Sequence, residues 1–414
     1  MTPYTYAQGE LHVEGVPLSR VAREFGTPCY VYSRAALTDA YAGFSQAFEG
    51  RDHLICYAVK ANSNLAVLDV FARLGSGFDI VSGGELCRVL AAGGNPSKIV
   101  FSGVGKSEVE IRDALAAGIL CFNVESESEL ARIDRIAGEL GMRAPISFRV
   151  NPDVDAGTHP YIATGLKNNK FGIPYVEAPR LYAQARGLRN VRIEGIDCHI
   201  GSQLTDLAPI SEALAKLGDL VDRLAADGIG LTHIDVGGGL GIRYQDEDPP
   251  ALAEYARTVL SALGGRPHKL LFEPGRLLAG NAGVVLTRIE HLKRGENRNF
   301  AIVDAAMNDL LRPALYDAWH DVLAVREGGP AETYDIVGPI CESGDFLARG
   351  RRLAAREGDL LAIMSAGAYA MCMASNYNSR PRAAEVMVDG EALHLIRERE
   401  ELSDLIARER RLPS

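Results

Sequence analysis

The sequence has 414 residues, of which 47% are hydrophobic and 24% are charged, and its formal net charge is −10. This length suits two domains, one large and one small, and the composition is typical of a globular protein that can bury a large core. Because phosphate binding requires a concentrated positive surface, the negative charge without any basic run argues against a nucleic-acid partner. No apolar run reaches the roughly 18 residues of a membrane span, so we expect no membrane partner.

Seven cysteines are scattered along the chain without a CxxC pair. This pattern predicts neither a disulfide framework nor a zinc site, and we expect no metal elsewhere. Residues 1–15 lack a basic segment followed by an apolar stretch, so we expect no signal peptide. These features together predict a reducing compartment and a cytoplasmic location.

From residue 54 onward, short apolar runs alternate with amphipathic helix patterns. The runs lack strict polar alternation, which is typical of parallel strands covered on both faces. Ser107 with Glu110, and Ser126 with Glu129, form capping-box patterns at two of the helix starts. Eight units predict a (β/α)8 barrel; a doubly wound sheet would also alternate, but the unit count and the placement of polar residues favour the barrel. The apolar runs are 54–60, 78–82, 98–103, 119–124, 146–151, 193–200, 233–239 and 270–275.

Beyond about residue 280 the pattern changes to strands without long intervening helices. Asp389-Gly390 lies between two such strands and predicts a hairpin, and Glu14-Gly15 predicts another near the start of the chain. We therefore expect an α/β protein with a barrel domain at 25–280 and an all-β domain built from 1–24 and 281–414.

Polar residues cluster where the predicted barrel strands end, which is where (β/α)8 barrels place their functional groups. The first run ends in Lys60, and His199 and Ser202 follow the sixth. The seventh run ends in the glycine turn 237–239, and the eighth in Glu273, Pro274, Gly275 and Arg276. Any one of these signals is weak, but together they define a candidate site on one rim.

A lysine at the end of an apolar strand can simply extend its ammonium into solvent. The alternative is a nucleophilic amine that forms a Schiff base. A glycine turn lets backbone N–H groups approach a phosphate, and a lysine beside such a turn is what pyridoxal 5'-phosphate (PLP) requires. Glu273 would then keep the pyridine nitrogen protonated. His199 could be a core histidine or could stack on the cofactor, and these residues alone leave both interpretations open.

Four motifs resemble those of the fold-type III PLP-dependent decarboxylases, in the same order and over nearly the whole chain. They are YAVKAN (57–62), CHIGSQ (198–203), DVGGGLG (235–241) and EPGR (273–276). Three further stretches, at 151–173, 338–347 and 375–388, most resemble the diaminopimelate decarboxylases within that family. The family joins a PLP-binding (β/α)8 barrel to a C-terminal β domain.

The resemblance assigns a role to each matching residue. Lys60 would carry PLP, His199 would stack on its ring and Glu273 would hold its nitrogen. The phosphate would be held by Ser202, Gly238, Gly239, Gly275 and Arg276, and Tyr369 would also contact the cofactor and substrate. The distal carboxylate of the substrate would be held by Arg276, Arg312 and Tyr316.

The resemblance also assigns Glu342 to the distal ammonium of the substrate and Cys341 to protonation of the carbanion left by CO2. Carboxylates flank Cys341 in the sequence CESGD, which suits a proton donor better than a thiolate nucleophile. In the family this segment reaches the neighbouring subunit's site, so a homodimer with shared active sites is implied.

The implied reaction converts meso-2,6-diaminopimelate to L-lysine, the final step of lysine biosynthesis. Arginines suit a distal carboxylate because their planar fork matches two oxygens. The main alternative is a decarboxylase of ornithine or arginine, which would have no use for these arginines. An alanine racemase would place an arginine where EPGR places Glu273, and a catalytically silent homologue would be expected to have lost Lys60 or Cys341.

Overall fold

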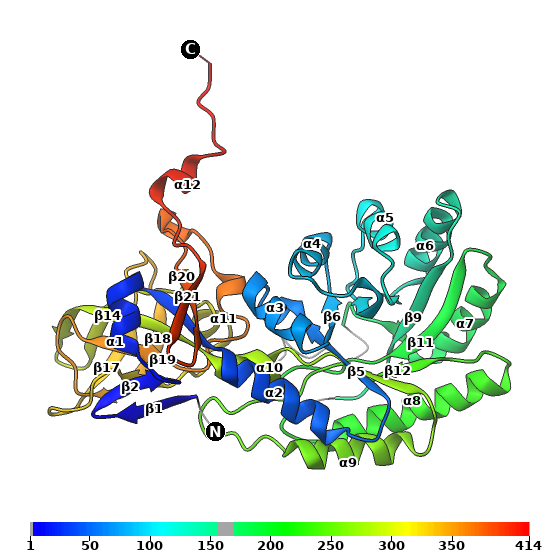
Figure 1. Cartoon of the computed structure of the whole chain (residues 1–414), viewed down its shortest axis with the longest axis horizontal. Coiled ribbons are helices and arrows are strands. Elements are labelled where there is room, and N and C mark those ends of the chain that lie inside the picture. Colours follow the sequence, from blue (N-terminus) through cyan, green and yellow to red (C-terminus); the bar gives the residue numbers. More distant parts are fainter. Residues whose placement is uncertain (1–2, 156–168, 414) are drawn as a thin grey trace. The chain divides into compact units, whose positions relative to one another are not determined.

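The computed structural model describes residues 3–155 and 169–413 (Figure 1). The chain divides into two compact units. The barrel unit comprises Ala40–Arg243 and Glu247–Leu278, and the β unit comprises Met1–Asp39, Tyr244–Asp246 and Ala279–Ser414. Residues 156–168, which belong to the motif stretch 151–173, lie outside the described residues.

Eight parallel strands close into a barrel, as the sequence predicted. Each strand pairs with the next, β8 pairs with β9, and β13 returns to pair with β5. Short β10 (Ile173–Pro174) adds to β9. The barrel strands are β5 (His53–Ala58), β6 (Gly77–Ile80), β7 (Ile99–Phe101), β8 (Cys121–Val124), β9 (Ala144–Asn151), β11 (Val191–Asp197), β12 (His233–Asp235) and β13 (Lys269–Phe272).

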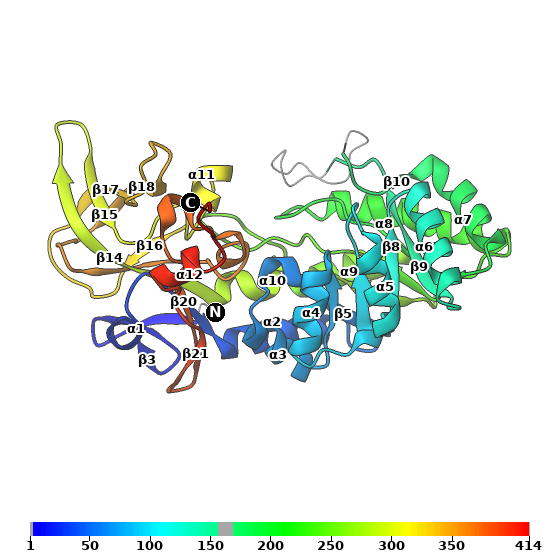
Figure 2. The same ribbon diagram turned by 90° about the horizontal axis from the view of Figure 1, so that it is seen from above.

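Helices surround these strands, and Figure 2 shows α4, α5 and α6 following one another along the outside of the barrel. They are α2 (Arg34–Ala47), α3 (Leu65–Arg73), α4 (Gly83–Ala91), α5 (Glu108–Ala117), α6 (Glu127–Glu139), α7 (Ala178–Gly187), α8 (Ala208–Ala226), α9 (Leu252–Leu263) and α10 (Arg276–Ala279). Single 3-10 turns lie at Val59–Ala61, Pro96–Lys98, Tyr175–Glu177 and Gly280–Ala282. Helices on the outside and side chains within explain why the strands are apolar on both faces.

The two predicted capping boxes differ in the structure. Ser107 and Glu110 form the full reciprocal box at the start of α5. Ser126 caps α6, but the Glu129 carboxylate instead accepts hydrogen bonds from the buried Lys106 ammonium, at 2.7 Å, and from the Glu125 amide. A buried ammonium needs a charged partner more than a helix start needs a second cap, so the ion pair prevails.

The β unit is organised around one sheet in the order β18-β17-β15-β14-β4-β20-β21, with β19 pairing to β14 and β16. Its apolar residues form clusters that include Tyr30, Tyr334 and Ile363 in one and Val31, Val284 and Val386 in another. The strands are β4 (Cys29–Ser33), β14 (Gly283–Arg294), β15 (Asn299–Val303), β16 (Val322–Ala324), β17 (Glu332–Val337), β18 (Phe346–Leu353), β19 (Leu360–Ile363), β20 (Ala384–Asp389) and β21 (Ala392–Arg397).

Both predicted hairpins are present in the β unit. Gly390 connects β20 to β21, and Glu14-Gly15 connects β2 to β3. Strand β4 falls inside the range 25–280 predicted for the barrel domain, but it pairs with β14 and β20 of this sheet. The remaining elements are β1 (Tyr4–Ala7), β2 (Glu10–Val13), β3 (Val16–Pro17), α1 (Leu18–Phe25), α11 (Arg312–Tyr316), α12 (Leu402–Ile406) and 3-10 turns at Met371–Met373 and Tyr377–Ser379.

Within residues 3–155 and 169–413, the structure contains no helix both long enough and apolar enough to cross a membrane.

Candidate active site

Lys60 lies at the carboxyl end of barrel strand β5, in the 3-10 turn that follows it. Its Nζ is 2.5 Å from Oδ2 of Asp79 in β6. The Asp79 side chain is fully buried, whereas 35% of the Lys60 side chain is exposed. The pairing anchors the lysine stem at the rim and leaves part of its side chain accessible from outside, as a reactive amine requires.

Three further carboxyl groups gather beneath this rim. Asp197 in β11, Asp235 in β12 and Glu273 after β13 have carboxylate oxygens within 4.8 Å of one another, and all three residues are buried. Burial and mutual repulsion raise the pKa of Asp197 and of Glu273 well above the ordinary range. Burial is also the main reason that the pKa of Asp235 is raised to about 7. The nearby cations therefore do not fully compensate the negative charge that these carboxyl groups would carry if all were ionised.

Glu273 is held in place by two neutral donors, one within β8 and one just after β7. The Asn123 amide donates to Glu273 Oε1 at 3.3 Å, and the Ser102 hydroxyl does so at 3.4 Å. Asn123 also donates to the Ser102 hydroxyl at 3.1 Å. The carboxyl group is thus oriented without being neutralised, which prepares it to accept a hydrogen bond from a cationic ring nitrogen.

His199 follows β11 and is half-buried. The Gly238 backbone N–H donates to its Nδ1 at 3.1 Å, so the neutral ring carries its proton on Nε2. Burial, and then the nearby Arg149 and Lys60 cations, lower the pKa of His199 well below its usual value. A neutral imidazole fixed by this backbone bond suits stacking on an aromatic ring.

The glycine turn after β12 is too tightly packed for any side chain. A Cβ on Gly238 would lie 2.2 Å from the Glu273 carbonyl oxygen, and one on Gly239 would lie 2.3 Å from the Gly201 carbonyl oxygen. Gly239 also has a φ of +110°, in the region that favours glycine. A Cβ on Gly275 would lie 2.9 Å from the Cβ of Ala61. Without side chains, these glycines let the backbone come close to a bound anion.

Ser202 and Arg276 meet beside this turn, where the Arg276 guanidinium donates to the Ser202 hydroxyl at 3.1 Å. The loops after β11 and β12 are joined by hydrogen bonds from Leu204 N to Gly239 O and from Gly241 N to Leu204 O, both 2.9 Å long. The barrel unit thus brings together the predicted phosphate-binding residues of three different loops.

The other predicted site residues all belong to the β unit. Arg312 begins α11 and is buried, with 7% of its surface exposed, and Tyr316 ends the same helix half-buried. Tyr369 is half-buried in the segment after β19, with a φ of +54°.

Cys341 and Glu342 are exposed in the loop between β17 and β18. The Asp345 carboxylate fixes this loop by accepting hydrogen bonds from the amides of Met307, at 2.7 Å, and Ile340, at 2.8 Å. The Cys341 amide donates to the Asn378 side chain at 2.9 Å. An exposed thiol on a fixed loop can be presented to another molecule.

Several polar residues of the rim were not predicted from the sequence, and they share one signal. Each is a buried polar residue within or just after a barrel strand, and its burial requires a partner. They are Asp79, Ser102, Asn123, Arg149, Asp197 and Asp235.

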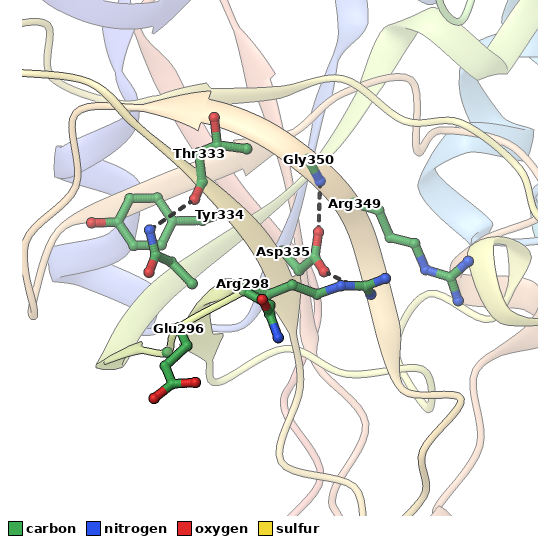
Figure 3. A pocket seen from close by; sticks show the side chains of 10 residues that line it. Glu296, Arg298, Thr333, Tyr334, Asp335, Arg349 and Gly350 are labelled. Carbon is green, nitrogen blue, oxygen red and sulfur yellow. Dashed lines mark hydrogen bonds and ion pairs between the residues drawn. The ribbon is translucent and has the colours of Figure 1, made fainter.

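The β unit contains a cavity of about 500 Å³, whose lining includes Arg298, Tyr334 and Asp335 (Figure 3). Asp335 in its wall already accepts a hydrogen bond from Gly350 N at 2.7 Å and pairs with Arg298 at 3.5 Å. None of the predicted site residues lines this cavity, and we assign it no function.

Comparisons with known proteins show the family of this chain. Residues 34–280 match the family model of the pyridoxal-dependent decarboxylase, pyridoxal binding domain. The diaminopimelate decarboxylase of Pseudomonas aeruginosa is 60% identical over 414 residues, which cover 100% of both chains.

Two solved structures are also similar. Diaminopimelate decarboxylase from M. jannaschii has a TM-score of 0.96 at 38% identity, covering 99% of this chain and 98% of that one. The Helicobacter pylori enzyme complexed with L-lysine has a TM-score of 0.92 at 44% identity, covering 94% and 98%. The chain belongs to the pyridoxal-dependent decarboxylases and, within them, to the diaminopimelate decarboxylase family.

The residues on the barrel rim fit the cofactor of this family. An accessible primary amine at Lys60, a desolvated carboxyl at Glu273 and a glycine cradle match an aldehyde, a ring nitrogen and a phosphate, respectively. The raised pKa of Glu273 also fits this cofactor, because a protonated ring nitrogen would supply the positive charge that the buried carboxyl lacks.

Replacing Asp235 tests the excess of buried carboxyl groups. Its pKa in the folded protein is raised from 3.8 to about 7, so it stabilises the fold below about pH 4 and this contribution is lost as pH rises through 7. In the cofactor-free wild type, the unfolding free energy should decrease between about pH 4 and pH 7 as Asp235 ionises. In Asp235→Asn this decrease should be smaller, by up to about 1.4 kcal/mol per pH unit. Urea denaturation across the pH range measures the effect.

The control is Asp222→Asn. The Asp222 carboxyl is exposed, and its pKa is lowered from 3.8, mainly by the hydrogen bond from Arg266, so it titrates below the same window. Parallel stability profiles for wild type and Asp235→Asn would contradict the assignment.

Proposed function

We propose that this protein catalyses the PLP-dependent decarboxylation of meso-2,6-diaminopimelate to L-lysine and CO2. The observation that carries the proposal is the barrel rim, where the Lys60 amine, the Glu273 carboxyl and the glycine cradle lie at the ends of neighbouring strands. The 60% identity to a diaminopimelate decarboxylase supports the choice of substrate.

Lys60 is the attachment point for the cofactor in this proposal. Its amine must lose a proton to act as a nucleophile, and Asp79 Oδ2, at 2.5 Å, is placed to accept it. Glu273 holds the ring nitrogen, oriented by Ser102 and Asn123. When bound, the cofactor supplies an electron-withdrawing ring that stabilises the carbanion left by CO2.

The remaining barrel residues hold the rest of the cofactor. Gly238, Gly239, Gly275, Ser202 and Arg276 would surround the phosphate. Because the Gly238 N–H already donates to His199, the hydrogen-bond donors would come from the other four residues. His199 is neutral and fixed by the Gly238 amide, so it stacks on the ring face without adding a positive charge. Tyr369 of the β unit also contacts the cofactor and the substrate.

Recognition of the substrate falls to cationic and anionic side chains together, because its distal end carries both a carboxylate and an ammonium. Arg276, Arg312 and Tyr316 bind the carboxylate, and Glu342 binds the ammonium. Arginine suits this task because its fork can donate to both carboxylate oxygens at once.

Cys341 would supply the proton that takes the place of the departing CO2, from the exposed loop that Asp345 fixes. We infer that this loop serves the active site of a second copy of the chain, in a homodimer with shared sites. Its exposure within a single chain supports this inference, because a residue buried in its own subunit could not reach another.

We also infer that the protein works in the cytoplasm. The seven cysteines are free thiols, which supports a reducing compartment.

Cofactor attachment can be mapped directly. Borohydride reduction followed by peptide mapping should place the pyridoxyl label on Lys60, and Lys60→Ala should abolish the label. The matched control is Lys269→Ala, since Lys269 begins strand β13 at the opposite end of the barrel. A label on any other residue, or its persistence in Lys60→Ala, would overturn the assignment.

A substrate panel tests the recognition of the distal carboxylate. CO2 release should favour meso-diaminopimelate over ornithine, arginine and lysine by roughly a hundredfold or more in kcat/KM, because losing a hydrogen bond to a charged group costs about 1.5–3 kcal/mol. A preference for ornithine or arginine would instead support the alternative decarboxylase.

Mixing two inactive variants tests the shared site. Lys60→Ala and Cys341→Ala have defects in different subunits of one site, so each mixed dimer has one intact site. After subunit exchange, activity should recover to roughly a quarter of wild type for random mixing.

The control mixture is Lys60→Ala with Glu273→Gln. Both residues lie in the barrel unit of the same chain, so every site of the mixed dimer keeps one defect and no recovery is expected. Failure of the Lys60→Ala and Cys341→Ala mixture to recover, with subunit exchange verified, would place Cys341 in its own subunit's site or outside the site.

A further inference from the structure

Arg312 is a buried arginine that contacts a histidine and a tyrosine ring. Its Nη1 is 3.0 Å from His320 Nε2, and its guanidinium lies over the Tyr244 ring at 4.5 Å from the ring centre. Both contacts fix the plane of the guanidinium.

The hydrogen bonds determine the tautomer of His320. An arginine can only donate, so His320 Nε2 must accept from Arg312. The other ring nitrogen, Nδ1, is 2.8 Å from the Met364 carbonyl oxygen and must donate to it. His320 is therefore a neutral imidazole. It is held by the Met364 carbonyl through Nδ1, and it orients the Arg312 guanidinium through Nε2.

His320 is itself held on several sides. It is completely buried, and its ring packs edge-on against Tyr244 with the ring centres 5.4 Å apart. Arg351 donates to the His320 carbonyl oxygen at 2.8 Å and stacks on the neighbouring Trp319 ring. A side chain this constrained can set the direction of a partner with little loss of entropy when a ligand binds.

We propose that His320 is a positioning residue that sets the orientation of Arg312 for the distal carboxylate of the substrate. The inference rests on the proposed function, in which Arg312 binds that carboxylate. An unrestrained arginine has several rotatable bonds, and a bidentate contact needs its fork in one plane. His320 fixes that plane through Nε2 without touching the substrate.

Two variants separate this role from a structural one, because each keeps a different hydrogen bond. In His320→Asn the amide occupies the position of Nδ1, so it retains the donor to Met364 but cannot reach Arg312. In His320→Gln the amide oxygen reaches the position of Nε2, so it retains an acceptor for Arg312. A positioning role predicts that Gln rescues function and Asn does not.

The first measurement is steady-state kinetics on the holoenzyme. His320→Asn should raise KM for meso-diaminopimelate by roughly tenfold with a much smaller change in kcat, because the lost interaction is made equally in the ground state and the transition state. His320→Gln should recover most of that loss. A structural defect would instead lower kcat and thermal stability in both variants.

The second measurement is ligand binding, followed by the visible absorbance of the holoenzyme. L-lysine carries a carboxylate, whereas 1,5-diaminopentane has the same carbon chain without one. The ratio of their dissociation constants should shift roughly tenfold against L-lysine in His320→Asn and stay close to wild type in His320→Gln. An unchanged ratio in His320→Asn would overturn the proposal.

Arg312→Met distinguishes failure of this inference from failure of the proposed function. If Arg312→Met weakens L-lysine binding and His320→Asn does not, only the role of His320 is wrong. If Arg312→Met has no effect on KM or on L-lysine binding, the assignment of Arg312 itself is wrong.

Discussion

Buried negative charge at the carboxyl ends of the barrel strands is the constraint on which the rest of the site depends. Asp79, Asp197, Asp235 and Glu273 are all buried there, and removing carboxylates from water costs several kcal/mol each unless positive charge compensates. Lys60 and Arg149 supply part of that charge, and the raised pKa of Glu273 indicates that it is not enough. A cationic ring nitrogen supplies more, so the cofactor completes the electrostatics of the barrel as well as its chemistry.

In the β unit the buried charged group is a cation rather than a carboxyl group. Arg312 is buried beside a neutral histidine and a tyrosine ring, and these contacts hold its guanidinium in one plane. The barrel rim thus presents carboxyl groups that attract a cation, and the β unit presents a guanidinium that attracts an anion. In the proposed function, one end of the substrate reacts at the cofactor and the other end is held by Arg312.

The sequence was sufficient to predict the barrel and its rim because both follow from local patterns. Eight apolar runs correspond to the eight strands, and Lys60, the glycine turn and Glu273 end three of them. Strands β4 and β14 were not predicted, because their pairing joins residues 29–32 to 283–286, a contact without a local signal. Asp79 and Asn123 were missed for a similar reason: each is one polar residue in an apolar strand, and only closure of the barrel reveals its partner.

His320 shows where such reasoning from sequence ends. The residue lies in an unremarkable stretch, LYDAWHDV, and a lone histidine there is as compatible with a core position as with a site. Its role follows from two hydrogen bonds whose directions are forced, one because arginine cannot accept and one because a carbonyl cannot donate. Neither direction can be obtained from spacing or composition. The residues that react are therefore visible in the sequence, whereas those that orient them become visible only when donors and acceptors are paired in three dimensions.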